Sequence, residues 1–170
     1  RLYAGGFTNT AANGDALMYS DDDGVTWISL ITKTGRNRQI TQGIDSFGSL
    51  YFLIEDGFHT ELWVVNNTII TQIYRWDNLT SPFIGTWNGN VYIQGLAGDG
   101  TLRYYKWNGA SLRVIFEEKA TDQVLATSRM IQWRENLYSF GLVYDGVITF
   151  PSYNFKTGSN NQLPFAVDRK

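Results

Sequence analysis

His59 is the side chain best suited to proton transfer, because it is the only histidine of the chain. Asp56 lies three residues before it and could orient its imidazole, as an aspartate does in serine hydrolases. The sequence contains no Gly-x-Ser-x-Gly motif that would present a serine nucleophile to such a base. We therefore expect His59 to be a loop histidine rather than a catalytic base.

The amino-acid composition argues against metal and thiol chemistry. The chain has no cysteine and one histidine, which excludes a thiolate nucleophile, a cysteine zinc site and a site of several histidines. The acidic run Asp21–Asp23 lacks both the alternating ligand spacing and the closing glutamate of a calcium loop. We predict no metal site and no cofactor.

The same acidic run belongs to a turn. Ser20 and Asp22 have short polar side chains that can bond the amides of a tight turn, and Gly24 can adopt the positive φ that such a turn needs. Thr26 and Trp27 follow, and the indole of Trp27 can fold over the hairpin as an apolar lid. These five residues predict a structural turn between two strands.

This spacing resembles the Asp-box, also called the BNR repeat, a hairpin turn of sialidase-type and related β-propellers. The resemblance covers one turn. It implies a propeller fold and, as one alternative, a sialidase-like glycoside hydrolase with an arginine triad, a tyrosine nucleophile assisted by a glutamate, and an aspartate acid/base. The residues that could take those roles here are Arg36 and Arg38, Tyr144, and Glu55 or Asp56. Their sequence context matches no motif of that family, so we expect no catalysis.

A repeat supports the propeller interpretation. The pattern x-Leu/Val-Tyr occurs four times, with its aliphatic residue at Leu2, Leu50, Val91 and Leu137, spacings of 48, 41 and 46 residues. This period suits a four-stranded propeller blade. We predict an all-β chain forming one β-propeller domain or propeller segment over residues 1–170. Its four antiparallel blades would cover about 1–34, 39–76, 81–118 and 124–170.

Each blade is expected to contain strands A, B, C and D, with the repeated pattern on strand B. Strand A is predicted at 39–47, 81–87 and 124–133, but no A strand precedes the first blade. Strand D of the fourth blade is predicted at 162–167, and residues 117–129 as a loop that runs into strand A. The first blade would thus lack its innermost strand. We expect other parts of a longer parent protein to close the ring.

In such a meander the D-to-A and B-to-C loops share one rim. The sequence predicts that this rim is long and polar, and that it binds a glycan or a protein surface. Its candidate binding residues are Arg36, Arg38, Asp56, His59, Trp76, Asp77 and Asp145.

Charge and hydropathy exclude two other classes of partner. The net charge is −2 and the lysines and arginines are scattered, whereas a nucleic-acid interface needs a basic patch. No apolar run approaches the ~20 residues that cross a bilayer, so we expect no membrane insertion.

We therefore predict a non-enzymatic binding or scaffold module of a larger protein, extracellular or virion-associated. The repeats resemble propellers of bacterial surface proteins and of phage tail or receptor-binding proteins. The sialidase-like hydrolase fragment and a purely structural assembly component remain the alternatives.

Overall fold

In a computed structural model, the chain folds into antiparallel sheets. The structure describes the backbone of residues 1–5, 15–32, 39–119, 126–133, 136–144, 148–154 and 159–163, and the side chains of 1–5, 17–31 and 39–117. All regular elements in these ranges are strands. No helix that could cross a membrane occurs among them.

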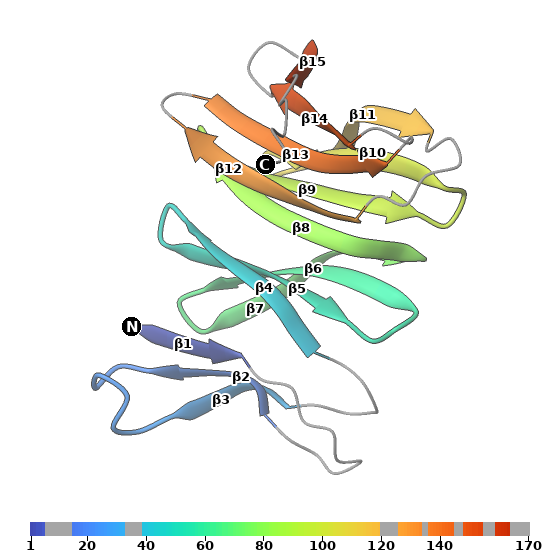
Figure 1. Ribbon diagram of the computed structural model, residues 1–170. Coiled ribbons are helices and arrows are strands. Elements are labelled where there is room, and N and C mark those ends of the chain that lie inside the picture. The colour runs from blue at the N-terminus through green and yellow to red at the C-terminus, as the bar shows by residue number, and fades with distance from the viewer. Residues whose placement is uncertain are drawn as a thin grey trace, which may run out of the picture. The chain divides into compact units, whose positions relative to one another are not determined.

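Each sheet is a meander in which consecutive strands pair in chain order (Figure 1). The first has three strands, β1 (Leu2–Gly5), β2 (Asp15–Ser20) and β3 (Ile28–Thr32). The other three have four strands each. The second comprises β4 (Gln39–Ser46), β5 (Ser49–Glu55), β6 (His59–Asn66) and β7 (Ile69–Asp77); the third β8 (Leu79–Trp87), β9 (Asn90–Ala97), β10 (Thr101–Trp107) and β11 (Leu112–Lys119); the fourth β12 (Ala126–Trp133), β13 (Asn136–Tyr144), β14 (Ile148–Asn154) and β15 (Ser159–Leu163).

The predicted blade pattern is confirmed, and among the described strands the first sheet has one fewer than the others. Two strand predictions were wrong. Glu117–Lys119 belongs to β11 and not to a loop, because Arg103 pairs with Glu117 across β10 and β11 and extends the ladder. The last strand begins at Ser159 and not at Gln162, since Asn154 pairs directly with Ser159. A fixed register thus decides both boundaries.

Tight turns join the strands where the chain offers residues that tolerate positive φ. Asn67 (φ 56°) lies between β6 and β7, and Asn88 (φ 47°) with Gly89 (φ 72°) lies between β8 and β9. Asparagine and glycine adopt this left-handed region at little cost, which is why they favour two-residue hairpins. The sequence spacing of these turns therefore sets the strand lengths.

The chain divides into two compact units, Arg1–Thr80 and Ser81–Lys170. The prediction of one domain over 1–170 stays a prediction. In the first unit, the core between the first and second sheets is built from Leu17, Phe52, Ile54 and Val65, each at most 2% exposed. Tyr3, Leu30 and Trp63 are among the partly buried side chains that pack against it. This core holds β6 and β7, which carry the candidate site.

Candidate binding site on the second sheet

The connection between β5 and β6 is a tight turn built by Asp56. Its Oδ1 accepts hydrogen bonds from the backbone N–H groups of Phe58 (2.9 Å) and His59 (2.7 Å). Gly57 supplies the positive φ of 89°. The backbone N–H of Asp56 donates to the His59 carbonyl (3.2 Å), and that of Asn78 donates to the Phe58 carbonyl (3.1 Å). The tip of the turn is therefore fixed at both ends and tied to the residue after β7.

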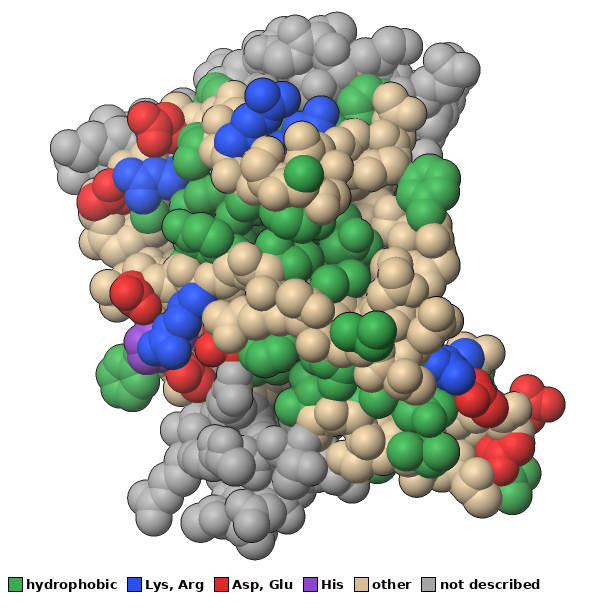
Figure 2. Space-filling model, turned by 180° about the vertical axis from the view of Figure 1, so that it is seen from behind, with side chains coloured by type: hydrophobic (Ala, Val, Ile, Leu, Met, Phe, Trp, Pro, Cys, Tyr) green, Lys and Arg blue, Asp and Glu red, His purple; other side chains and the backbone are tan. Residues whose placement is uncertain are grey.

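His59 lies between two carboxylates. Its Nδ1 is 3.0 Å from Asp56 Oδ2, and its Nε2 is 3.5 Å from Asp77 Oδ1. The side chains of His59 and Asp56 are 28% and 25% exposed, while that of Asp77 is 76% exposed. Figure 2 shows the histidine, in purple, at the surface among acidic and basic side chains. The imidazole thus has a hydrogen-bonded carboxylate at Nδ1 and a second carboxylate near Nε2, and it keeps access to solvent.

The charges continue along the same face of the sheet. His59 pairs with Asp77 and Glu61 with Arg75 in the register of β6 and β7, and residues two apart on a strand share a face. Arg75 lies between the two acids, with its Nε 3.5 Å from Asp77 Oδ1 and its Nη1 3.9 Å from Glu61 Oε1. Glu61 is buried, and its Oε2 accepts a hydrogen bond from the indole N–H of Trp63 at 2.9 Å. The row runs from a buried acid to an exposed one.

The pKa of Asp56 is lowered from its usual value. Partial burial is the largest single influence and raises that pKa, but hydrogen bonds from the backbone N–H groups of Phe58 and His59 and from the His59 ring outweigh it. Because each of these bonds favours the charged form, the turn holds an ionised carboxylate beside the imidazole.

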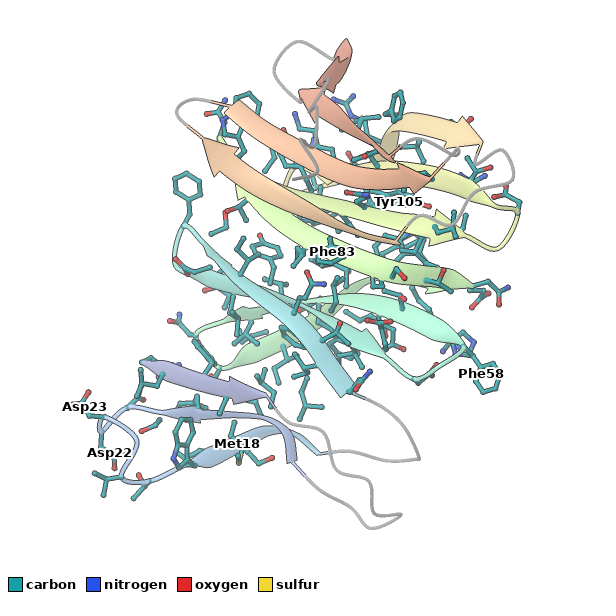
Figure 3. The ribbon with its side chains drawn as sticks, in the orientation of Figure 1. Met18, Asp22, Asp23, Phe58, Phe83 and Tyr105 are labelled. Carbon is teal, nitrogen blue, oxygen red and sulfur yellow. The ribbon has the colours of Figure 1, made fainter. Side chains whose placement is uncertain are left out.

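The exposed aromatic ring of this site is Phe58, which is 76% exposed. Figure 3 shows its ring pointing outward from the turn between β5 and β6. Its ring centroid is 6.4 Å from that of His59. Trp76, which the sequence suggested as the stacking residue, is only 7% exposed and packs on Tyr74 at 4.9 Å. Phe58 is therefore exposed beside His59, whereas Trp76 is buried.

The structure brings together three of the residues predicted for the binding rim, Asp56, His59 and Asp77. Arg36, Arg38 and Asp145 lie outside the described residues. Of the catalytic candidates, Glu55 ends β5 and Tyr144 ends β13, where its side chain is not described.

Sequence reasoning missed Phe58, Glu61 and Arg75. The alternation His59-x-Glu61 and Arg75-x-Asp77 could have indicated two facing strands with charges on one side. Nothing in the sequence, however, fixes which residues of β6 and β7 stand opposite each other.

The sequence also predicted long, loop-like connections on this rim. For the connections between β5 and β6 and between β9 and β10, that prediction was wrong. Asp56-Gly57 and Asp99-Gly100 each form a tight turn. Asp99 uses its carboxylate as Asp56 does, accepting from the Thr101 backbone N–H at 3.0 Å. Aspartate before glycine is a strong turn signal, and it explains the short connections.

The Asp-box-like turn between β2 and β3 has the predicted hydrogen bonds. Asp22 Oδ1 accepts from the Thr26 backbone N–H at 2.8 Å and Oδ2 from the Thr26 hydroxyl at 2.5 Å. The Ser20 hydroxyl donates to Asp22 Oδ1 at 2.7 Å and accepts from the Gly24 backbone N–H at 2.8 Å. The bonds from Thr26, then that from Ser20, lower the pKa of Asp22 to about 2. The Asp22 carboxylate is therefore engaged by hydrogen bonds within the turn.

Trp27 folds back on this turn, with its indole N–H donating to the Gly24 carbonyl at 3.0 Å, but it remains 41% exposed. Asp21 makes a bidentate ion pair with Arg1, at 2.7 and 2.8 Å. Arg1 also donates to the Asn67 carbonyl in the β6–β7 turn at 2.7 Å. These turns thus share the end of the first unit opposite to Phe58 (Figure 3). No group of three or more acidic or histidine side chains in the described part is placed to hold a metal ion.

No protein-family model and no curated protein sequence matches this chain. Solved structures do match in fold. The N-terminal domain of Nup159 aligns with a TM-score of 0.54 at 11% identity, covering 87% of this chain and 42% of that one. An Aleuria aurantia lectin in complex with α-methyl-L-fucoside aligns with a TM-score of 0.51 at 15% identity, covering 86% of this chain and 53% of the lectin.

The chain has the β-propeller fold. It spans about half or less of the length of these structures. A second structure of the Aleuria aurantia lectin, in complex with Fucα1-6GlcNAc, gives a similar result, with a TM-score of 0.52 at 16% identity over 88% of this chain and 54% of the lectin. At these identities the likeness concerns the fold. The cluster of charged side chains that includes Asp56 and Arg75 belongs to the second sheet of this propeller.

Proposed function

We propose that this propeller is a non-enzymatic binding module that takes a glycan at the turn between β5 and β6. The observation that carries the proposal is Phe58, an exposed ring on a turn that Asp56 holds rigid, next to a row of charged side chains. A ligand site built on such fixed elements loses little conformational entropy on binding.

The chemistry of the site suits a sugar. An exposed aromatic face offers the apolar surface on which a pyranose ring stacks. Asp77 and Arg75, 76% and 46% exposed, offer acceptors and donors for hydroxyl groups. Asp77 adjoins His59, whose ring centroid is 6.4 Å from that of Phe58. Small-ligand sites typically combine an apolar surface with a small number of polar groups that converge beside it. The lectin with the same fold binds a fucoside in its solved structure, which supports the choice of a sugar as the first ligand to test.

The proposal includes no catalysis. Glycoside hydrolysis needs two carboxyl groups at a fixed separation on either side of the scissile bond. Asp56, one of the catalytic candidates, is engaged by two backbone N–H groups and an imidazole, an arrangement that suits a structural or ligand-orienting carboxylate. A hydrolase would need its acid and its nucleophile elsewhere. Release of a fluorogenic sugar by the chain would contradict this part of the proposal.

We place the module in a larger extracellular or virion-associated protein, on the resemblance of its repeats to propellers of bacterial surface and phage tail proteins. A purely structural component of an assembly is the alternative that remains if no ligand is found.

The test is a glycan array with the full 170-residue chain, followed by titration of every sugar that binds, with α-methyl-L-fucoside as a fixed first probe. Phe58→Ala should weaken binding at least about tenfold, as expected when one stacking ring is lost. Phe47→Ala is the matched control, because Phe47 is 87% exposed but lies in the β4–β5 turn. Its affinity should be unchanged.

Two outcomes would contradict the proposal. One is the absence of any bound sugar on the array. The other is equal affinity for Phe58→Ala and the parent chain with both correctly folded by circular dichroism, which would place the ligand elsewhere. Binding of a protein but of no sugar would replace the glycan with a protein partner.

A further inference from the structure

The two ring nitrogens of His59 face different carboxylates. Nδ1 lies 3.0 Å from Asp56 Oδ2 and 3.2 Å from Asp56 Oδ1, whereas Nε2 lies 3.5 Å from Asp77 Oδ1. A neutral imidazole carries one N–H group and one lone pair, so it can donate to only one of these carboxylates. The position of the ring proton therefore decides what the imidazole offers to a ligand.

The proton of the neutral ring belongs on Nδ1. Partial burial raises the pKa of Asp56, but hydrogen bonds from two backbone N–H groups and from the His59 ring outweigh it and hold that pKa below its usual value. The Asp56 carboxylate is therefore ionised, and both of its oxygens can only accept. They lie closer to Nδ1 than Asp77 lies to Nε2. The Nδ1–H group thus donates to Asp56, and Nε2 keeps its lone pair.

Nε2 and the Asp77 carboxylate then form a pair of acceptors at the surface. Neither can donate to the other, and the two side chains are 28% and 76% exposed, so both atoms are open to donors from a ligand. Arg75 lies on the other side of Asp77, with its Nε 3.5 Å from the same Oδ1. Its guanidinium can donate to the oxygen of a group that Asp77 binds. A hydroxyl group suits this order of acceptors and donor, because it both donates and accepts.

The charges of the site favour an uncharged ligand. Arg75 already lies between two carboxylates, at 3.5 Å from Asp77 and 3.9 Å from Glu61, so an acidic sugar would meet more negative than positive charge. An ammonium group has donors but no acceptor, so it cannot accept from Arg75 as a hydroxyl can. The charged groups around His59 in the described ranges are Asp56 in the turn, Glu61 on the same strand, Arg75 and Asp77 on β7, and Glu55 at the end of β5.

We propose that His59 Nε2 and the Asp77 carboxylate are the acceptor pair of the glycan site at the β5–β6 turn, and that they select a neutral sugar that donates two adjacent hydroxyl groups to them. This inference rests on the proposed function and names its ligand class and two specificity-determining residues. Protonation of His59 turns Nε2 into a donor to Asp77, which removes one acceptor and occupies the other. The affinity for the sugar therefore falls as the pH falls through the range in which histidine side chains take up a proton.

The first experiment needs no ligand. Because His59 is the only histidine of the chain, a nitrogen NMR spectrum of the labelled 170-residue chain reports this one imidazole. At about pH 8 we expect a protonated Nδ1 and an unprotonated Nε2. A proton on Nε2 at that pH, in a neutral or a charged ring, would overturn the inference and leave the glycan proposal untouched, since Nε2 would then already donate to Asp77.

The second experiment titrates α-methyl-L-fucoside, and the neutral sugar that binds most tightly on the array, at about pH 8 and about pH 5. We expect binding to be at least about tenfold weaker at the lower pH, as when a hydrogen bond to a charged site is lost. His59→Gln can still accept through its side-chain oxygen but does not titrate, so its affinities at the two pH values should differ by less than about twofold. Saturating sugar should also leave less His59 protonated at a given pH, because linkage is reciprocal.

Two results of these titrations would overturn the inference. One is a parent chain that binds the sugar equally well at both pH values. The other is a His59→Gln chain that loses as much affinity as the parent chain at the lower pH, which would assign the pH dependence to the carboxylates.

A third experiment changes the other acceptor. Asp77→Asn keeps the shape of the side chain but replaces one acceptor oxygen by an amide donor, and it should weaken binding at about pH 8 at least about tenfold. Asp23→Asn, at an exposed carboxylate in the β2–β3 turn, is the matched control and should leave the affinity unchanged. Equal affinity of a correctly folded Asp77→Asn chain and the parent chain, or tighter binding of acidic than of neutral sugars on the array, would overturn the inference and leave the glycan site in place. Absence of any bound sugar would overturn both.

Discussion

The Asp-box-like turn offers a direct test of the hydrogen bonds on which the fold assignment from sequence depended. The change is Ser20→Ala, which removes one oxygen atom and adds no bulk. Ser20 is 1% exposed, and its hydroxyl accepts the Gly24 backbone N–H at 2.8 Å and, less favourably, that of Asp22 at 3.3 Å. The substitution therefore leaves the Gly24 N–H without its acceptor.

The expected loss follows from these contacts. A neutral hydrogen bond contributes about 0.5–1.5 kcal/mol net, and an N–H group left unpaired adds to the loss when water cannot reach it. Gly24 is half-buried, so water replaces the acceptor only in part. Losing the hydrogen bond from the Ser20 hydroxyl to the exposed Asp22 carboxylate adds nothing to the expected loss of stability, because water replaces it. We expect the free energy of unfolding to fall by about 1–2 kcal/mol, and each kcal/mol lowers the melting temperature by about 2–4 °C in a chain of this size.

Urea unfolding followed by tryptophan fluorescence measures the loss, and Trp27 reports on the turn itself because its indole bonds the Gly24 carbonyl. The matched control is Ser29→Ala, an exposed serine on β3 of the same sheet, which should change stability by no more than about 0.5 kcal/mol. Equal effects of Ser20→Ala and Ser29→Ala would refute the reasoning, since they would show that the turn does not depend on the Ser20 hydroxyl.

Three further predictions concern the first unit. The pKa of Asp22 is about 2 in the folded chain and higher in the unfolded one, so the stabilising effect of its charge is fully present above about pH 4 and is lost as the pH falls to about 2. The difference in urea stability between the parent chain and Asp22→Asn should therefore disappear over that pH range. A difference that stays constant would contradict this prediction. Phe52→Ala should cost about 3–5 kcal/mol because Phe52 is 1% exposed in the core, whereas Phe47→Ala, at a ring 87% exposed, should cost no more than about 0.5 kcal/mol; similar urea midpoints for the two variants would count against the described packing. Gly5→Val should destabilise by about 1–3 kcal/mol, since its side chain would press on Ile40, and an unchanged melting temperature would show that the two strands are further apart.

Strand order and turn position were the features that the sequence predicted well. Asn-Gly, Asp-Gly and the Asp-box-like spacing specify turns through local φ preferences and side-chain bonds to nearby amides, and these need no partner from elsewhere in the chain. The end of β11 and the start of β15 were misplaced because ladder pairing of Arg103 with Glu117 and of Asn154 with Ser159 extends strands through polar residues. Pairing of this kind outweighs the local signal for a loop.

The candidate site was predicted in part. Asp56 and His59 could be linked from the sequence because they lie within one turn. Arg75 could not be added, because its place beside Glu61 follows from the register between β6 and β7. Trp76 was assigned to the surface from its position next to polar residues, but it is buried.

The sequence by itself determined that this chain is a series of antiparallel hairpins, since alternating side chains and turn residues are local properties. Only the tertiary structure decided which side chains stand together. Register and face depend on pairing between strands, and a shift of one residue moves every side chain to the opposite face. The charged row beside Phe58 arises from that pairing, so it could not be found before the strands were placed against one another.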